Sequence, residues 1–265
     1  MANHVGVIGA GVMGEALIAA LIRSGVKTAD ISFTEKRAER AEELAERYSI
    51  SHLPMAELLS KASTILLVVK PQDMQATLRD MAKDCGPQTL LISFAAGKTI
   101  QSIATEIGGD HPIVRVMPNT PALIGLGASG YSFGPGLNEA QKDFVRTFLA
   151  ATGIAIEVPE NLQDAVTATS GSGPAYFFAF VEAMVEGAVS LGLAREDATQ
   201  LTIQTITGAA ALLTQSGDSP KTLREKVTSP NGTTAAALAS FSQSELAETV
   251  AKAMQAAAKR SQELG

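Results

Sequence analysis

The sequence predicts an α/β fold in which an N-terminal Rossmann-type, doubly wound and mainly parallel sheet is followed by an all-helical C-terminal domain. Short apolar runs of strand length alternate with helical patterns over the first half of the chain, which is typical of repeated βαβ units. A glycine turn at 9–14 lies between the first apolar run and the first helical pattern. After Glu157 the strand patterns stop. We therefore expect two domains, 1–160 and 161–265.

The elements of the first domain follow from local periodicity. Strands are expected at apolar runs bounded by turn residues, namely 4–8, 31–34, 64–69, 89–93, 113–117, 128–133 and 154–158. Helices are expected where apolar residues recur at helical spacing, namely 13–24, 37–48, 74–83, 100–107 and 138–151. Gly25 ends the first helix, and Pro71 stops the strand at 64–69.

The second domain reads as helices throughout. They are expected at 164–170, 175–191, 195–216, 221–227, 233–240 and 244–263. Helix 175–191 is too apolar for an ordinary surface, so we expect the chain to form a homo-oligomer through this domain. The apolar run 174–193 that contains this helix is not expected to span a membrane, because Glu182 and Glu186 would lie together on one face in lipid.

Composition excludes several function classes. The 265 residues are 46% hydrophobic, enough for a sizeable core, and the net charge of −6 argues against nucleic-acid or anionic-membrane partners. The one cysteine, Cys85, excludes an intrachain disulfide and a multi-cysteine metal site, so a cytoplasmic location is expected. The chain enters a strand pattern at once, so no signal peptide is expected. His4, His52 and His111 share no ligand spacing, and we expect no metal.

The glycine turn predicts a dinucleotide site. Gly9 permits a tight turn, Gly11 lets a pyrophosphate approach the backbone, and Gly14 lets the helix pack closely on the strand. A glycine-rich turn that binds nothing is the alternative, but the flanking strand, helix and second βα unit disfavour it. The candidate cofactor contacts here are Gly9, Ala10, Gly11, Val12, Met13 and Gly14.

The end of the second strand bears on the type of cofactor. Thr34, Lys36 and Arg37 favour a 2′-phosphate and therefore NADPH. Glu35 favours a 2′-hydroxyl, so NADH stays possible.

Three loops follow other strands at the edge where ligands bind in open α/β sheets. They are 69–72, 95–97 and 117–121, rich in small residues and proline. The candidate cofactor contacts in them are Val69, Lys70, Pro71, Ala96, Gly97 and Asn119.

A second turn, at 229–234, opens directly into an alanine-rich helix. Backbone N–H groups and hydroxyls gathered in such a turn are suited to hold a carboxylate. The candidate substrate contacts are Ser229, Asn231, Gly232, Thr233 and Thr234. Helix capping by the threonines is the alternative interpretation.

Several segments together resemble one enzyme family, and the resemblance runs nearly end to end. The segments are VIGAGVMG (7–14), VKPQ (69–72), SFAAG (93–97), RVMPNTPA (115–122), SGSGPAY (170–176) and LREKVTSPNGTT (223–234). They resemble pyrroline-5-carboxylate reductase, and the last two are the most specific of them.

The resemblance implies a Rossmann domain and a helical domain that builds an intertwined dimer, often assembled into decamers. It implies reduction of the cyclic imine to L-proline by NADPH or NADH. Val69, Lys70 and Ala96 would lie along the cofactor, and the turn at 231–234 would receive the substrate carboxylate. Thr234 would be the catalytic hydroxyl near the ring nitrogen, and we expect it to orient that nitrogen or a water.

The chain departs from the family pattern at two positions. Asn231 stands where the family usually has glycine, and we expect the turn to survive because asparagine tolerates left-handed backbone. Met55 stands where many members have an asparagine that reaches the cofactor ribose.

Two other functions fit the sequence less well. Hydroxyacid dehydrogenases share the domain order but use a lysine early in the helical domain, and no lysine occurs between Lys142 and Lys221. A protein that binds NADP without turnover would not need the carboxylate turn.

Overall fold

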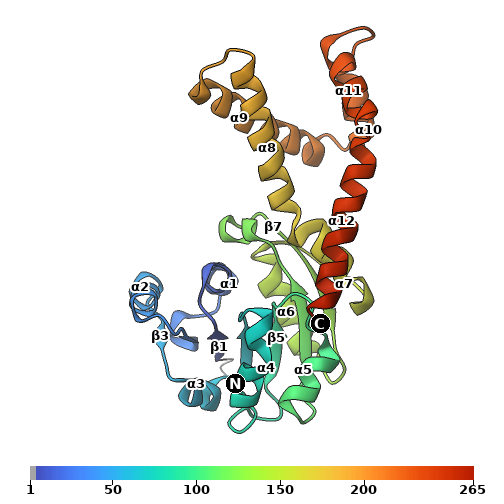
Figure 1. The fold of residues 1–265 in the computed structure, drawn as a ribbon. Helices are drawn as coiled ribbons and strands as arrows, with labels where there is room; N and C mark the ends of the chain where they lie inside the picture. The colour runs from blue at the N-terminus through green and yellow to red at the C-terminus, as the bar shows by residue number, and fades with distance from the viewer. Residues whose placement is uncertain (1–3) are drawn as a thin grey trace. The chain divides into compact units, whose positions relative to one another are not determined.

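The computed structural model describes residues 4–265, which fold into two compact units (Figure 1). One unit contains the residues up to Pro174 together with Gln255–Gly265, and the other contains Ala175–Met254. The last helix, α12 (Leu246–Glu263), therefore begins in the second unit and ends in the first.

Within the described residues, eight strands form one sheet in the order β3-β2-β1-β4-β5-β6-β7-β8. All neighbours pair in parallel except β6 and β7, which are antiparallel. The strands are β1 (Val5–Ile8), β2 (Ile31–Thr34), β3 (Ser51–His52), β4 (Thr64–Leu67), β5 (Leu90–Ser93), β6 (Ile113–Met117), β7 (Gly127–Phe133) and β8 (Gly153–Glu157). The order reverses between β1 and β4, so a crevice opens at their carboxyl ends.

Helices cover both faces of the sheet (Figure 1). They are α1 (Val12–Arg23), α2 (Ala38–Tyr48), α3 (Met55–Lys61), α4 (Met74–Met81), α5 (Ile100–Ile107), α6 (Glu139–Ala150) and α7 (Gln163–Val166). One core joins the sheet to α1, α2 and α6 and includes Leu17 and Phe148, while the other joins it to α3, α4 and α5 and includes Leu58 and Ile103. Each such buried side chain contributes about 1.5–3 kcal/mol relative to exposure.

The second unit is built from helices alone among the residues described. They are α8 (Gly173–Ser190), α9 (Arg195–Gln215), α10 (Pro220–Lys226), α11 (Thr233–Gln243) and the first part of α12. Large apolar side chains of this unit are exposed, namely Phe177, Phe178, Phe180, Met184, Leu191, Leu193, Leu201, Ile203, Leu212, Leu213, Val227, Phe241, Leu246 and Val250. Residues 4–265 include no helix with the length and hydropathy that a membrane crossing requires.

The structure confirms the predicted fold class and corrects three details. The strand expected at 64–69 ends at Leu67, which leaves Val68 and Val69 in the loop beyond the sheet. The short elements β3 and α3 were not predicted, since two exposed residues and a seven-residue helix give little periodicity. The helix expected at 164–170 is α7 followed by a π-helical turn, Thr167–Gly171.

Candidate functional site

The glycine turn has the geometry that its three glycines predict. Gly9 has φ +93°, and a Cβ there would lie 2.8 Å from the carbonyl oxygen of Val68. A Cβ on Gly14 would lie 2.2 Å from the carbonyl oxygen of Gly9, so α1 packs on the turn as closely as glycine allows. A Cβ on Gly11 would meet no atom within 4 Å. The turn is thus tight on its inner side and open at Gly11.

The start of α1 presents free backbone donors beside this opening. Gly11 is the N-cap and offers no side-chain cap, and the first helical bond runs from the Glu15 N–H to the Gly11 carbonyl at 2.9 Å. The N–H groups of Val12, Met13 and Gly14 therefore precede the hydrogen-bonded part of the helix. Such a helix start favours anions, and here it stands where a pyrophosphate can approach.

A cluster of charged residues joins α1 to α2 behind the turn. The carboxylate of Glu15 is paired with Arg40 and Arg47 and accepts a hydrogen bond from the Tyr48 hydroxyl at 3.0 Å. Burial raises the pKa of Glu15, but the hydrogen bonds from Arg40, Tyr48 and Arg47 outweigh it, so the pKa lies below its ordinary value. Arg40 and Arg47 therefore neutralise the negative charge of the Glu15 carboxylate in the first turn of α1.

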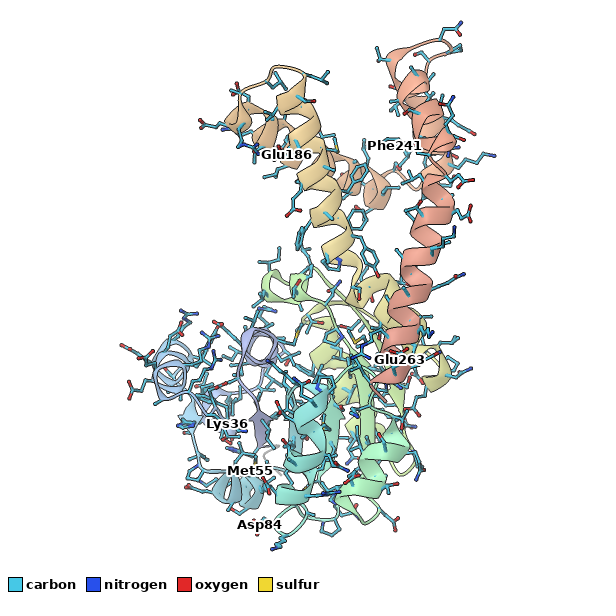
Figure 2. The ribbon with its side chains drawn as sticks, viewed as in Figure 1. Lys36, Met55, Asp84, Glu186, Phe241 and Glu263 are labelled. Atoms are coloured by element: carbon cyan, nitrogen blue, oxygen red, sulfur yellow. The ribbon has the colours of Figure 1, made fainter. Side chains whose placement is uncertain are left out.

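A cavity of about 540 Å³ lies at the crevice between β1 and β4. It brings together predicted cofactor contacts from three parts of the sequence, namely Gly9, Gly11, Thr34, Lys36, Arg37, Val69 and Lys70. Figure 2 labels Lys36 and Met55 on this part of the chain. The cavity size suits a small-molecule site. A glycine turn with an open approach, free helix N–H groups and an adjoining cavity together fit a dinucleotide.

Glu35 lies in the wall of the cavity and is held by Arg37. The backbone N–H and the Nε–H of Arg37 both donate to Oε1 of Glu35, whose side chain is 9% exposed. Burial raises the pKa of Glu35, but the Arg37 hydrogen bonds outweigh it and the pKa is lowered. Lys36 and Arg37 themselves are exposed.

Met55, which the family resemblance places near the cofactor ribose, lines the cavity from the start of α3. The rest of the wall was not predicted: it is a stripe on the turn and helix after β4, formed by Asp73, Ala76, Thr77 and Asp80. The stripe has i, i+3, i+4, i+7 spacing and follows Lys70, which is the signal that could have found it.

The remaining predicted cofactor residues do not line this cavity. Ala10 and Gly14 are buried in the turn, while Val12 is exposed and Met13 half-buried beside it. Pro71 begins the short 3₁₀ turn Pro71–Asp73. The Oδ1 of Asn119 accepts the backbone N–H of Ala128 at 2.9 Å, which ties its own loop to β7.

The 95–97 loop packs against the end of α12 in the same unit. Gly97 has φ +78°, and a Cβ there would lie 2.5 Å from the carbonyl oxygen of Ser261. Ala96 is half-buried between the two buried residues Ala95 and Gly97. The loop lies at the carboxyl end of β5, next to β4, and thus near the crevice.

The turn at 229–234 in the second unit has the predicted left-handed residue. Asn231 has φ +56°, and the Gly232 N–H donates to the Ser229 carbonyl at 3.0 Å. Gly232 is the N-cap of α11 and no side chain caps it, so neither threonine acts as the cap. The first helical bond runs from the Ala236 N–H to Gly232. The N–H groups of Thr233, Thr234 and Ala235 therefore precede the hydrogen-bonded part of the helix, a geometry that favours anions.

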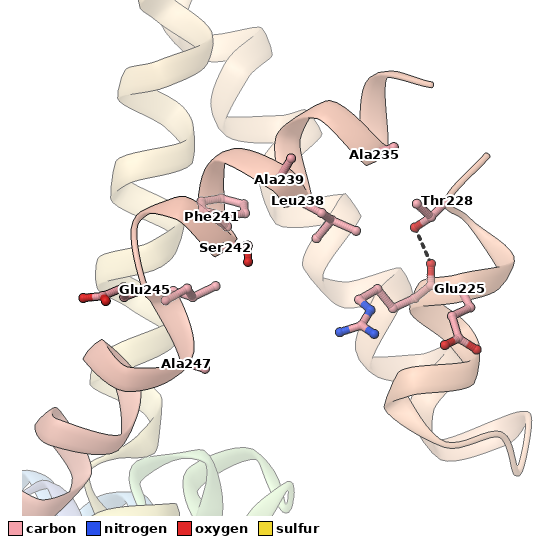
Figure 3. A pocket seen from close by; sticks show the side chains of 11 residues that line it. Glu225, Thr228, Ala235, Leu238, Ala239, Phe241, Ser242, Glu245 and Ala247 are labelled. Atoms are coloured by element: carbon pink, nitrogen blue, oxygen red, sulfur yellow. Dashed lines mark hydrogen bonds between the residues drawn. The ribbon is translucent and has the colours of Figure 1, made fainter. Parts of the chain in front are cut away.

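The second unit also contains a cavity of about 640 Å³, which does not include that turn. Figure 3 shows its wall along α10, α11 and the start of α12, where the apolar side chains of Leu238 and Phe241 lie together with charged ones such as Glu225 and Glu245. The Thr228 hydroxyl is not free there, because it donates to the Arg224 carbonyl at 2.6 Å. The hollow belongs to the exposed apolar surface of this unit.

The three histidines contact other groups in the part of the chain that is described, and the His52 ring lies 5.3 Å from that of Phe33 between centroids. His4 Nε2 lies 2.9 Å from the Ser32 hydroxyl, and His111 Nδ1 lies 3.4 Å from the Thr89 carbonyl. Among residues 4–265, no group of three His, Cys, Asp or Glu side chains is placed to hold a metal ion.

Comparison with known proteins covers both units. Residues 160–264 match the family model for pyrroline-5-carboxylate reductase dimerisation, and residues 4–97 match that for NADP oxidoreductase, coenzyme F420-dependent. The chain is 42% identical over 263 residues to a pyrroline-5-carboxylate reductase of Pseudomonas aeruginosa, covering 98% of this chain and 96% of that protein.

Solved structures agree with these relatives. The pyrroline-5-carboxylate reductase of Coxiella burnetii superposes with a TM-score of 0.91 at 32% identity, covering 100% of this chain and 99% of that one. The Plasmodium falciparum pyrroline carboxylate reductase, solved with NADP bound, has a TM-score of 0.88 at 30% identity with the same coverage.

Proposed function

Since the chain belongs to the pyrroline-5-carboxylate reductase family, we propose how its residues divide the work of such an enzyme. It is an NAD(P)H-dependent oxidoreductase that reduces L-1-pyrroline-5-carboxylate to L-proline, the last step of proline biosynthesis. When bound, the nicotinamide cofactor supplies the hydride that adds to the imine carbon, while a proton adds to the ring nitrogen. The protein has to bind, orient and shield the two reactants.

The first unit binds the cofactor. The turn from Gly9 to Gly14 and the N–H groups at the start of α1 hold the pyrophosphate. Support comes from the open side of Gly11 and from the adjoining cavity. Val69, Lys70 and Pro71 border the ribose and phosphates, and Ala96, Gly97 and Asn119 shape the loops toward the nicotinamide.

The part of the cofactor site that binds the adenosine half is selective for NADPH. Thr34, Lys36 and Arg37 surround the position of the 2′-phosphate, and two exposed cations favour that dianion. The carboxylate of Glu35 is engaged by Arg37 and is less available to a 2′-hydroxyl.

The second unit binds the substrate. The substrate carboxylate accepts hydrogen bonds from the N–H groups of Thr233 and Thr234. The same turn also contains Ser229, Asn231 and Gly232. Support comes from the uncapped start of α11 and the left-handed Asn231. The Thr234 hydroxyl orients the ring nitrogen or a water that supplies its proton.

The cavity at the crevice, which joins the glycine turn to Thr34, Lys36 and Lys70, is the observation that most supports this assignment. A spectrophotometric assay tests it. We expect NADPH oxidation with pyrroline-5-carboxylate and none of the NADP reduction with hydroxy acids that a dehydrogenase would give. Absence of both reactions in folded protein would instead support a cofactor-binding protein without turnover.

Thr234 can be tested separately. Thr234→Ala should lower kcat/KM about tenfold at saturating NADPH, because one oriented hydrogen bond is lost. Thr233→Ala is the matched control, since it removes a neighbouring hydroxyl from the same turn. Unchanged efficiency of Thr234→Ala would remove Thr234 from the mechanism.

The chain is an oligomer-forming member of its family, and we propose a homodimer built through the helical unit, with assembly to a decamer. The exposed side chains of Phe177, Phe178 and Leu201 would be covered in such a dimer. Light scattering on Phe178→Glu should give a monomer where the unchanged chain gives a dimer or larger. Lys252→Glu on exposed α12 is the control.

We further propose a functional division at 160/161 and a cytoplasmic location. The dimerisation match begins at residue 160, close to the proposed division. A reducing compartment suits the free thiol of Cys85. Cell fractionation with an antibody to the protein tests the location.

A further inference from the structure

A buried arginine outside the cofactor cavity is bonded to two carboxylates. Arg115 lies on β6, and its side chain is 5% exposed. Its Nη1 lies 3.5 Å from Oε1 of Glu160, and its Nη2 lies 3.4 Å from Oδ1 of Asp164. One carboxylate is enough to neutralise the charge of one guanidinium. Charge balance alone therefore does not explain why both Glu160 and Asp164 lie beside Arg115.

The same two oxygens also bind groups on either side of the 95–97 loop. Oε1 of Glu160 accepts the backbone N–H of Ile100 at 2.7 Å, at the start of α5. Oδ1 of Asp164 accepts the hydroxyl of Ser261 at 2.6 Å. Ser261 is 2% exposed, so this bond is shielded from water.

Ser261 is in turn pressed against the loop. A Cβ on Gly97 would lie 2.5 Å from the Ser261 carbonyl oxygen and 2.8 Å from Cβ of Leu264. Figure 2 labels Glu263 in this last turn of α12. The loop is therefore fixed at one end by the Ile100 N–H and on its side by α12, and both contacts lead back to Arg115.

We propose that Arg115, Glu160, Asp164 and Ser261 form a positioning network that holds the 95–97 loop for the nicotinamide half of the cofactor. This inference rests on the proposed function, in which Ala96 borders that half. The network touches neither cofactor nor substrate. It acts by fixing backbone that borders the cofactor, much as groups behind a metal ligand orient that ligand.

Glu160 is the best place to test the network. Glu160→Ala removes the acceptor for Ile100, whereas Glu160→Gln keeps an oxygen for it and leaves Arg115 paired with Asp164. Glu139→Ala is the matched control, because Glu139 is also an acid in the first turn of a helix, is paired with Lys142, and lies on the exposed face of α6.

The readout is the dissociation constant of two probes. NADPH binding is followed by nicotinamide fluorescence, in a chain without tryptophan. Binding of 2′,5′-ADP, which lacks the nicotinamide half, is followed by calorimetry. Glu160→Ala should raise the dissociation constant of NADPH about five- to tenfold and change that of 2′,5′-ADP less than about twofold. Glu160→Gln and Glu139→Ala should match the unchanged chain for both probes.

Hydrogen exchange adds a structural readout, and peptides covering 94–101 should exchange faster in Glu160→Ala. If Glu160→Ala does not fold, Ser261→Ala serves instead, with a two- to threefold rise for NADPH alone. Equal weakening of both probes, or a Gln variant as weak as the Ala variant, would overturn the network. Failure of the unchanged chain to bind NADPH would instead overturn the proposed function.

Discussion

The backbone N–H and the Nε–H of Arg37 both donate to Oε1 of Glu35, at 3.1 and 3.0 Å. Glu35 therefore already accepts two hydrogen bonds from the protein. It lies at the end of β2, where an acidic residue would otherwise bind the ribose 2′-hydroxyl of NADH. Arg37 and Lys36 both line the cavity beside it. The pair therefore bears directly on the choice between NADPH and NADH.

Arg37→Ala should lower the preference for NADPH. We expect kcat/KM with NADPH to fall about tenfold, since a charge-assisted contact to the 2′-phosphate is lost. The value with NADH should not fall, because NADH has no such phosphate and Glu35, released from Arg37, becomes available to the ribose 2′-hydroxyl. Steady-state rates with both cofactors give the ratio. Arg79→Ala, which removes an exposed arginine paired with Glu106, is the control, and an unaltered ratio in Arg37→Ala would contradict the assignment.

Two glycines of the first turn should separate binding from folding. Gly11→Ala places a methyl group in open space, so we expect an unchanged melting temperature and a dissociation constant for NADPH raised at least about tenfold. Gly14→Ala places one 2.2 Å from the Gly9 carbonyl oxygen, so we expect a loss of about 1–3 kcal/mol in unfolding free energy. Thermal unfolding and NADPH titration check both, and equal melting temperatures of the two variants would count against this division.

The glycine turn could be predicted from sequence because its constraints are local. The chain passes from strand through turn to helix within ten residues. Steric clash then allows few backbone conformations at Gly9 and Gly14. The bond between Glu160 and Ile100 could not be predicted, because it joins residues 60 apart that only the folded sheet brings together. Asn119 shows the same limit. Its amide looks free in sequence, but its oxygen is used by Ala128.

Asn231 should respond to substitution according to its left-handed backbone. Asn231→Gly keeps φ +56° without strain, so the KM for pyrroline-5-carboxylate should stay within about twofold. Asn231→Val should raise that KM about tenfold or more, because a β-branched residue costs roughly 1–2 kcal/mol or more there and moves the Thr233 and Thr234 N–H groups. The KM for NADPH is the internal control. A Val variant with an unchanged substrate KM would show that this turn does not hold the carboxylate.

The Glu15 cluster should make the stability of the first unit depend on acid pH. The pKa of Glu15 in the folded chain is lowered from its ordinary 4.5, so the folded state favours the charged form more than the unfolded state does. The stabilising contribution of the Glu15 charge is fully present above about pH 4.5 and is lost as the pH falls through the lowered pKa.

Glu15→Gln should therefore unfold more easily than the unchanged chain at pH 7. We expect a difference of about 1 kcal/mol in unfolding free energy, because solvent partly screens the ion pairs of this cluster. The two free energies should converge as the pH falls through the lowered pKa of Glu15. Urea unfolding of both proteins between pH 3 and 7 measures the difference, and Glu139→Gln on exposed α6 is the control. A difference that stays constant with pH would mean that Glu15 stabilises the unit by packing alone, without its charge.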